Sequence, residues 1–221
     1  MPYGPFHLPR LVLCEGRRDE AFFHALTEAR GLPEFHVTSP SEEHGGGKSG
    51  FLRALKGMAI ATGFERITDI VLAADNDEDP DTSFREVIDY LKAEPNLGSP
   101  ARAIAIPTQP NVRADGEIST TALMLPWIGI PGSLDSLCLE ASSRAHPTQS
   151  RCVDIYAGCV GANSWPASKQ AKMKLRSLFA GTHRRNPDIG FGNVWRDRPN
   201  LVPLEDPCFD QLADFLRLLG P

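Results

Sequence analysis

The sequence predicts an α/β fold with a doubly wound, mainly parallel sheet flanked by helices. Two observations predict it. Short apolar runs alternate with amphipathic segments up to about residue 106, and the strand predicted at Asp69–Ala74 is apolar after its first residue. A strand that is apolar on both faces is typical of a parallel sheet covered by helices, and strand–helix alternation requires crossover connections. With 221 residues, 41% of them hydrophobic, the chain can build one substantial core.

The elements follow from the period of the apolar residues and from glycine and proline stops. Strands are predicted at Leu11–Cys14, Glu34–Thr38, Asp69–Ala74 and Ala103–Ile106, and helices at Asp19–Arg30, Ser49–Gly63 and Asp81–Ala93. Beyond them, Ile118–Ile130 is predicted extended, Gly181–Pro207 is predicted as loop, and helices are predicted at Leu134–Ser143, Ser168–Phe179 and Phe209–Leu219. We interpret residues 1–145 as an α/β core and residues 146–221 as a helical and loop elaboration of the same domain.

Composition limits the classes of function. The net charge of −5 gives no global basic field, so nucleic-acid binding would need local patches or bound metal. No apolar run approaches the roughly 18 residues of a membrane helix, and the first residues, MPYGPFHLPR, lack a signal-peptide core. Five scattered cysteines without a CxxC pair indicate a reduced, cytoplasmic protein with neither a disulfide framework nor a zinc site.

The stretch EHGGGKSG is close to a phosphate-binding loop but fails the pattern. A Walker A loop needs a glycine five residues before the Gly-Lys-Ser end, and that position is Glu42, whose carboxylate would repel phosphate. Two interpretations of the loop stay open. Lys48 and the amides of Gly45–Gly47 contact a substrate phosphate, or the glycines form a mobile connection without contacts.

Carboxylates follow two of the predicted strands, where sites form in open α/β sheets. Glu15 and Asp19 follow the first strand, and Asp75 and Asp77 follow the third. Several carboxylates at one sheet edge repel each other unless a cation neutralises them, and oxygen ligands favour Mg²⁺ or Mn²⁺. The alternative is a solvated acidic turn at residues 75–79, with Asp19 as a helix cap.

These residues carry a resemblance to a known family. The segments LVLCEGRRDEAFF and IVLAADNDEDP resemble the two motifs of the Toprim domain, and they cover about half of the chain. In the second half, GIPGSLDSLCLEA, SKQAKMKLRSLFAG and GFGNVWRDRP resemble segments of the OLD (overcoming lysogenization defect) nucleases and related small Toprim proteins. Asp135 stands where that family more often has Glu, and the ATPase domain that OLD proteins usually carry has no counterpart within these 221 residues.

The resemblance implies a Mg²⁺- or Mn²⁺-dependent nuclease that hydrolyses phosphodiester bonds by a two-metal mechanism. It implies metal ligands at Glu15, Asp19, Asp75, Asp77 and Asp135, a catalytic role for Glu15, and Lys172 as the stabiliser of transition-state charge. Lys48 and Lys174 are the candidate substrate contacts. From residue type alone, a solvated position on a basic helix is the favoured interpretation of Lys172, and only the resemblance makes the catalytic role comparable.

The charge distribution fits a nucleic-acid partner, with DNA expected. Residues 166–199 are basic whereas the N-terminal half carries most of the acids. Trp165 and Trp195 flank this region as base-stacking or core-packing rings. By analogy with OLD proteins, a separately encoded ATPase and a role in phage defence are expected. The sequence leaves a homodimer open.

Two other classes of function remain. One is a non-catalytic Toprim module that binds nucleotide, nucleic acid or a partner ATPase. The other is a phosphatase or phosphotransferase in which DNDED serves as an aspartyl nucleophile loop. That loop normally follows the first strand of its fold, and here it follows the third, so we rank this alternative last.

Overall fold

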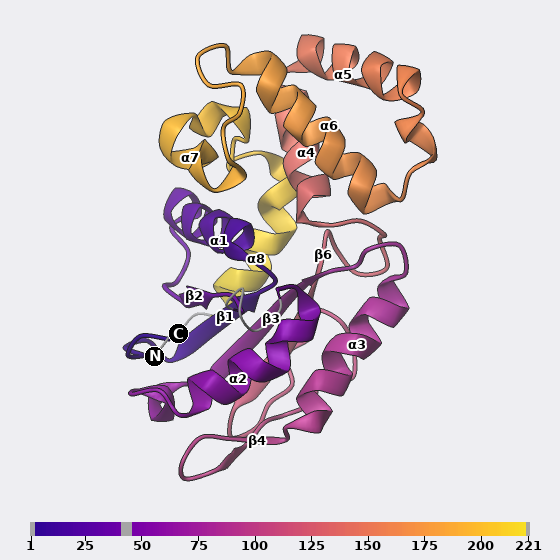
Figure 1. The fold of residues 1–221 in the computed structure, drawn as a ribbon. Helices are drawn as coiled ribbons and strands as arrows, with labels where there is room; N and C mark the ends of the chain where they lie inside the picture. The colour runs from indigo at the N-terminus through magenta and orange to yellow at the C-terminus, as the bar shows by residue number, and fades with distance from the viewer. Residues whose placement is uncertain (1–2, 41–45, 220–221) are drawn as a thin grey trace. The chain divides into compact units, whose positions relative to one another are not determined.

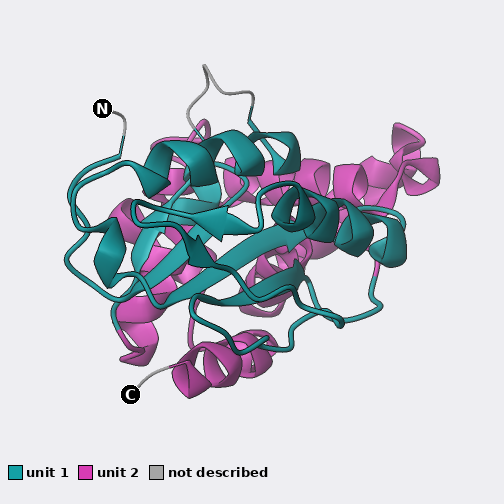
Figure 2. Cartoon of the chain, turned by 90° about the horizontal axis from the view of Figure 1, so that it is seen from below, with its two compact units in different colours: residues 1–20, 34–130 teal, residues 21–33, 131–221 magenta. Residues whose placement is uncertain are grey.

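The structure is a computed structural model that describes residues 3–40 and 46–219. Within it the chain forms two compact units (Figure 2). The first takes in residues 1–20 and 34–130, and the second takes in residues 21–33 and 131–221. Helix α1 (Arg17–Arg30) therefore contributes its first turn to the first unit and its remainder to the second.

The first unit is built on a sheet of four strands that all run parallel (Figure 1). The strand order is β2-β1-β3-β6, formed by β1 (Arg10–Cys14), β2 (His36–Thr38), β3 (Asp69–Asp75) and β6 (Ser119–Leu125). Strands that are neighbours in the sheet are thus joined by crossover connections, as parallel pairing requires. The predicted α/β class with a helix-flanked parallel sheet is confirmed, and it is consistent with a Toprim-like doubly wound fold.

The apolar strands are buried on both faces. Leu13 of β1 pairs in register with Leu72 of β3, and both side chains are fully buried. Val12 and Val71, which alternate with them and so point to the opposite face, are at most 2% exposed. Burial on both sides explains why β3 is apolar without the alternation of a half-exposed strand.

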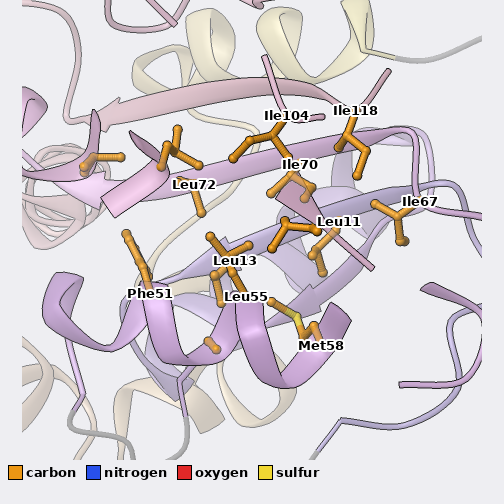
Figure 3. Packing of buried hydrophobic residues seen from close by; sticks show 14 of the residues in the cluster. Leu11, Leu13, Phe51, Leu55, Met58, Ile67, Ile70, Leu72, Ile104 and Ile118 are labelled. Atoms are coloured by element: carbon orange, nitrogen blue, oxygen red, sulfur yellow. The ribbon is translucent and has the colours of Figure 1, made fainter. Parts of the chain in front are cut away.

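Helices α2 (Phe51–Ala59) and α3 (Pro80–Ala93) pack on the face of the sheet that carries Leu11 and Leu13. Figure 3 shows Leu55 and Met58 of α2 lying against these two leucines. Each such side chain, when fully buried, contributes roughly 1.5–3 kcal/mol of transfer free energy. This shared core holds β1 and β3 in place, and the candidate site lies beyond the carboxyl ends of these two strands.

Two predictions for the first unit are wrong: the end of one helix and the placement of one strand in the sheet. The helix after the glycine loop ends at Ala59, and a short turn with Gly63 at φ +86° precedes Phe64. The strand predicted at Ala103–Ile106 does not join the sheet: β5 (Arg102–Ala103) pairs antiparallel with β4 (Asn96–Leu97), and Ile104 forms only a single bridge to Ile118. Pro107 follows Ile106 directly and has no N–H, so it cannot extend a ladder of hydrogen bonds from this segment into the sheet. The fourth strand is β6, within the predicted extended segment.

The second unit is helical apart from its loops. Helix α4 (Leu134–Ala145) packs on α6 (Ala167–Thr182) and on α5 (Pro147–Cys159). With α8 (Asp210–Leu218), α4 and α6 confirm the three helices predicted after residue 130. Helix α5 had no sequence prediction, and the short α7 (Val194–Asp197) lies in the segment Gly181–Pro207, for which the prediction of loop is wrong at these four residues. In α5 only Val153 and Ala157 are buried while Ile155 and Tyr156 are exposed, so no single apolar face identifies it.

None of the helices in the described part of the chain has the length and apolar character needed to cross a bilayer.

We expect Gly63→Ala to destabilise the first unit. At φ +86° a side chain is strained, and a Cβ at this position would overlap the carbonyl oxygen of Phe6. The free energy of unfolding should fall by about 1–3 kcal/mol, as measured by thermal or chemical denaturation followed by circular dichroism. Gly4→Ala is the control, since nothing lies within 4 Å of a Cβ there. Equal loss in both variants would contradict the steric explanation.

Candidate functional site

The candidate site lies at the carboxyl end of the sheet, where Glu15 follows β1 and Asp75 ends β3. Because β1 and β3 are paired in register up to Cys14 and Ala73, the chain beyond each strand emerges at the same edge. The backbone N–H of Asp75 donates a hydrogen bond to Oε1 of Glu15 at 2.9 Å. The structure therefore joins the first acidic segment to the second, as the sequence predicts.

Glu15 is a carboxylate with a strongly perturbed environment. Burial raises the pKa of Glu15 from 4.5 to about 7, and the negative charges of Asp19 and Asp77 also act to raise it. The hydrogen bond from Asp75 and the positive charge of Lys48 oppose this rise in pKa. Both predicted acidic pairs thus act electrostatically on Glu15, which near neutral pH is poised between its two protonation states.

Asp19 has the position that both interpretations of the sequence allow. It lies in the first turn of α1, and its Oδ2 accepts a hydrogen bond from the Gly16 N–H at 3.0 Å. This bond holds the turn between β1 and α1, while the charge of Asp19 raises the pKa of Glu15. Asp19 is therefore both a structural residue of the turn and a member of the acidic group.

Lys48 from the glycine-rich loop lies among the acids. Its Nζ donates to Asp77 Oδ2 at 2.6 Å, to Ser83 Oγ at 3.0 Å and to the Asp75 carbonyl at 3.1 Å. Glu86 Oε2 is 3.7 Å away, and the lysine side chain is only 12% exposed. Burial alone would lower the pKa of Lys48, but the bond to Asp77 and the nearby carboxylates raise it, so the ammonium stays charged.

The glycine loop is explained in part by this lysine. The N–H of Gly47 donates to the Glu15 carbonyl at 3.0 Å, and Gly47 has φ +77°. The loop thereby approaches the end of β1 and directs Lys48 toward Asp77. Gly45, which the sequence paired with Lys48 as a phosphate contact, lies outside the described residues.

Asn76 is a site residue that sequence reasoning missed. Its side chain is 1% exposed, and its Nδ2 donates to the carbonyls of Trp127 and Ile130 at 2.7 Å each. Ser83 Oγ donates to the Asn76 carbonyl at 2.8 Å. These bonds attach the chain beyond β6 to the acidic turn, and Asp77 follows with φ +49°. The available signal was a polar residue placed directly after an apolar strand, between two acids.

The acids of the turn DNDED have two different roles. Asp79 caps α3: its carboxylate accepts from the Thr82 N–H at 3.1 Å and from Thr82 Oγ1 at 2.7 Å, and these bonds lower the pKa of Asp79. Asp75 and Asp77, by contrast, contact Glu15 and Lys48. The alternative of a solvated acidic turn thus describes Asp79, whereas Asp77, although its side chain is 51% exposed, is ion-paired with Lys48.

Three predicted site residues belong to the second unit. Asp135 lies in the first turn of α4, and Lys172 Nζ on α6 is 3.9 Å from its Oδ2. Lys174 Nζ is 2.9 Å from Asp154 Oδ1 of α5, which engages its ammonium within the unit. The acidic group described above is formed by residues of the first unit alone.

The acidic group has the oxygen atoms that a hard divalent cation needs. In this structure, however, they are not arranged as the ligands of one ion. The donors are carboxylate oxygens, the type that Mg²⁺ and Mn²⁺ prefer. Among the residues that the structure describes, however, no three His, Cys, Asp or Glu side chains gather as metal ligands do. Lys48 is hydrogen-bonded to Oδ2 of Asp77, so this oxygen becomes available to a cation only if the carboxylate turns from the lysine.

We expect Glu15 to make the protein less stable as the pH rises. Since its pKa is about 7 in the folded state against an ordinary 4.5, its contribution is fully present below pH 4.5 and is lost as pH rises through about 7. Relative to Glu15→Gln, the wild-type free energy of unfolding should decrease by roughly 1–3 kcal/mol across that window. Denaturant titrations in the presence of a chelator measure it, and parallel pH profiles would refute the assignment.

Lys48→Met should raise the pKa of Glu15 above about 7, because the ammonium is a nearby positive charge that lowers it. Carbon-detected NMR titration of the Glu15 carboxyl is the direct readout. Lys56→Met is the matched control, since Lys56 pairs with Glu94 at 2.9 Å elsewhere in the same unit. A Glu15 pKa that is the same in both variants would show that Lys48 does not act on the carboxylate.

The comparisons with known proteins give a family for the chain. A family model described as "Protein of unknown function (DUF3226)" matches residues 9–220. Searches of curated proteins and of solved structures found no match. The matched residues run from just before β1 to beyond α8 and so take in residues of both units. The chain therefore belongs to the family described as DUF3226.

Proposed function

We propose that this protein is a Mg²⁺- or Mn²⁺-dependent phosphodiesterase that cleaves nucleic acid. The observation that carries the proposal is the buried Glu15 carboxylate, which is bonded to the Asp75 N–H and is influenced by the charges of Asp19 and Asp77. Strongly perturbed titratable groups at the carboxyl edge of a parallel sheet are characteristic of catalytic sites. The Toprim resemblance gives the reaction class.

In this proposal Glu15, Asp19, Asp75 and Asp77 hold the cations, joined by Asp135 as the resemblance implies. When bound, divalent cations supply an activated water and neutralise charge on the leaving oxygen. The residues of the chain perform the rest. Glu15 gives up its proton when the positive charge beside it increases, and the Asp75 N–H keeps its carboxylate oriented.

Lysines give the proposed site its positive side chains. Lys48 holds Asp77 in the resting arrangement, and once Asp77 turns away its ammonium is available to a substrate phosphate. Lys172 is the proposed stabiliser of the transition-state charge, and Lys174 a proposed substrate contact. Both roles rest on the resemblance alone.

The proposed context follows from the same resemblance. We propose DNA as the substrate, the cytoplasm as the compartment, and a separately encoded ATPase as a partner in phage defence. These are analogies with the OLD proteins.

A second candidate is a non-catalytic module that binds nucleotide, nucleic acid or a partner ATPase. One observation favours it: Lys48 Nζ lies 2.6 Å from Asp77 Oδ2, so an internal cation already neutralises one of the carboxylates. A group of carboxylates whose negative charge is partly neutralised by a lysine can remain stable without a metal ion. In that case the acids position the loops around them, and their removal leaves partner binding intact.

The test is nicking of supercoiled plasmid by the purified chain with Mg²⁺ or Mn²⁺. Asp75→Ala keeps the backbone N–H that Glu15 accepts from and removes only the carboxylate, so it separates metal binding from the structural bond. We expect Asp75→Ala and Glu15→Gln to lower the nicking rate by about 100-fold or more. Lys172→Ala tests the role assigned by resemblance.

Asp89→Asn on the exposed side of α3 is the matched control and should cut at the wild-type rate. Nicking that survives in Asp75→Ala would reject the proposed site. If wild type cuts nothing while Mg²⁺ still raises its melting temperature, and Asp75→Ala loses that shift, the binding module is the correct interpretation.

A further inference from the structure

A cleft of about 380 Å³ is lined by residues of the second unit alone. One side is formed by Ala25 and Glu28 of α1, and the other by the chain from Trp195 to Glu205. Its volume falls in the range of small-molecule sites, roughly 300–1,000 Å³. The proposed nuclease makes no use of it.

Trp195 gives the cleft a rigid aromatic wall. Its indole Nε1 donates to the Val202 carbonyl at 3.1 Å. Its ring meets Phe191 edge-on, with centroids 5.0 Å apart at 86°, and Phe22 with centroids 5.7 Å apart. A ring held by a hydrogen bond and two aromatic neighbours presents a fixed surface, so a ligand that contacts it loses little binding energy to ordering the site.

The two sides of the cleft are also tied to each other. Arg30, at the end of α1, donates from Nε to the Leu204 carbonyl at 2.6 Å and from Nη2 to the Asp206 carbonyl at 2.9 Å. The same Nη2 lies 2.9 Å from Asp210 Oδ1. The distance between α1 and the 204–206 segment is therefore set by the arginine, and the cleft is formed without a ligand.

Two carboxylates line the cleft without a protein partner. Glu28 and Glu205 are exposed, and neither side chain has a hydrogen bond or an ion pair within residues 3–40 and 46–219. Their neighbours differ: Asp210 pairs with Arg30, and Asp206 pairs with Arg144 at 2.9 Å. The negative charge at the cleft is thus concentrated on the two glutamates, with the amide of Asn200 as a further polar group of the lining.

We propose that this cleft binds a small organic cation, in which an amidinium, guanidinium or ammonium group is joined to a flat or apolar body. A cation is attracted to an indole face and forms strong charge-assisted bonds with carboxylates, while Ala25, Ala29 and Pro199, none of them buried, receive the apolar part. An anionic or nucleic-acid ligand would be repelled by both glutamates. A free small molecule and an arginine side chain share the required chemistry.

The test uses benzamidine, a flat amidinium, with neutral benzamide as its isostere. Each is titrated into the full chain while the indole N–H of Trp195, assigned by its loss in Trp195→Phe, is followed by NMR. We expect benzamidine to shift this signal and benzamide at the same concentration to leave it in place. Glu28→Gln and Glu205→Gln should each weaken binding about tenfold, and their surface positions keep the fold intact.

Glu34→Gln, an exposed glutamate outside the cleft, is the control and should bind as wild type does. A capped arginine amide that binds more tightly than benzamidine would assign an arginine side chain as the source, and the reverse order would assign a free small molecule. The proposal is overturned if neither cation shifts Trp195, if benzamide shifts it equally, or if both Gln variants bind as wild type does.

Discussion

The hydrogen bond from the Asp75 N–H to the Glu15 carboxylate is the constraint on which the acidic edge depends. It exists because β1 and β3 pair in parallel register, which brings chain positions 60 residues apart to one point. A carboxylate buried without such a donor would cost several kcal/mol or stay protonated. The sheet therefore both creates the cost of burying Glu15 and supplies part of what offsets it.

Lys48 supplies the other part. Its side chain is only 12% exposed, and its ammonium contacts Asp77, Ser83 and the Asp75 carbonyl and acts on Glu15 through its charge. It balances repulsion among the acids, and it also engages one carboxylate that a divalent cation would need. Stability and the proposed chemistry thus make opposite demands on one side chain, a conflict that is common at functional sites.

The sequence predicted those parts of the fold that depend on local pattern. Apolar runs identified β1 and β3, and because parallel strands end at one edge, the amino-acid pattern alone was enough to place Glu15 and Asp75 together. The partners of Lys48 could not be predicted, since they depend on how Lys48 lies against Asp77 and α3 in the folded chain. The positive φ of Asp77 and the burial of Asn76 were equally hidden, because both are imposed by contacts with the chain beyond β6. Helix α5 lacked a one-sided apolar pattern.

The all-parallel sheet also has a kinetic consequence. Each strand pairing brings together segments distant in sequence, as where Asp69 meets Ser119, so none of the four strands can begin as a hairpin. Loop-closure entropy must be overcome before these contacts stabilise anything, which makes such topologies slow to fold. Asp75 and Glu15 remain apart until β1 and β3 have paired. The Asp75–Glu15 hydrogen bond should therefore form late, after helices α2 and α3 have acquired their local structure.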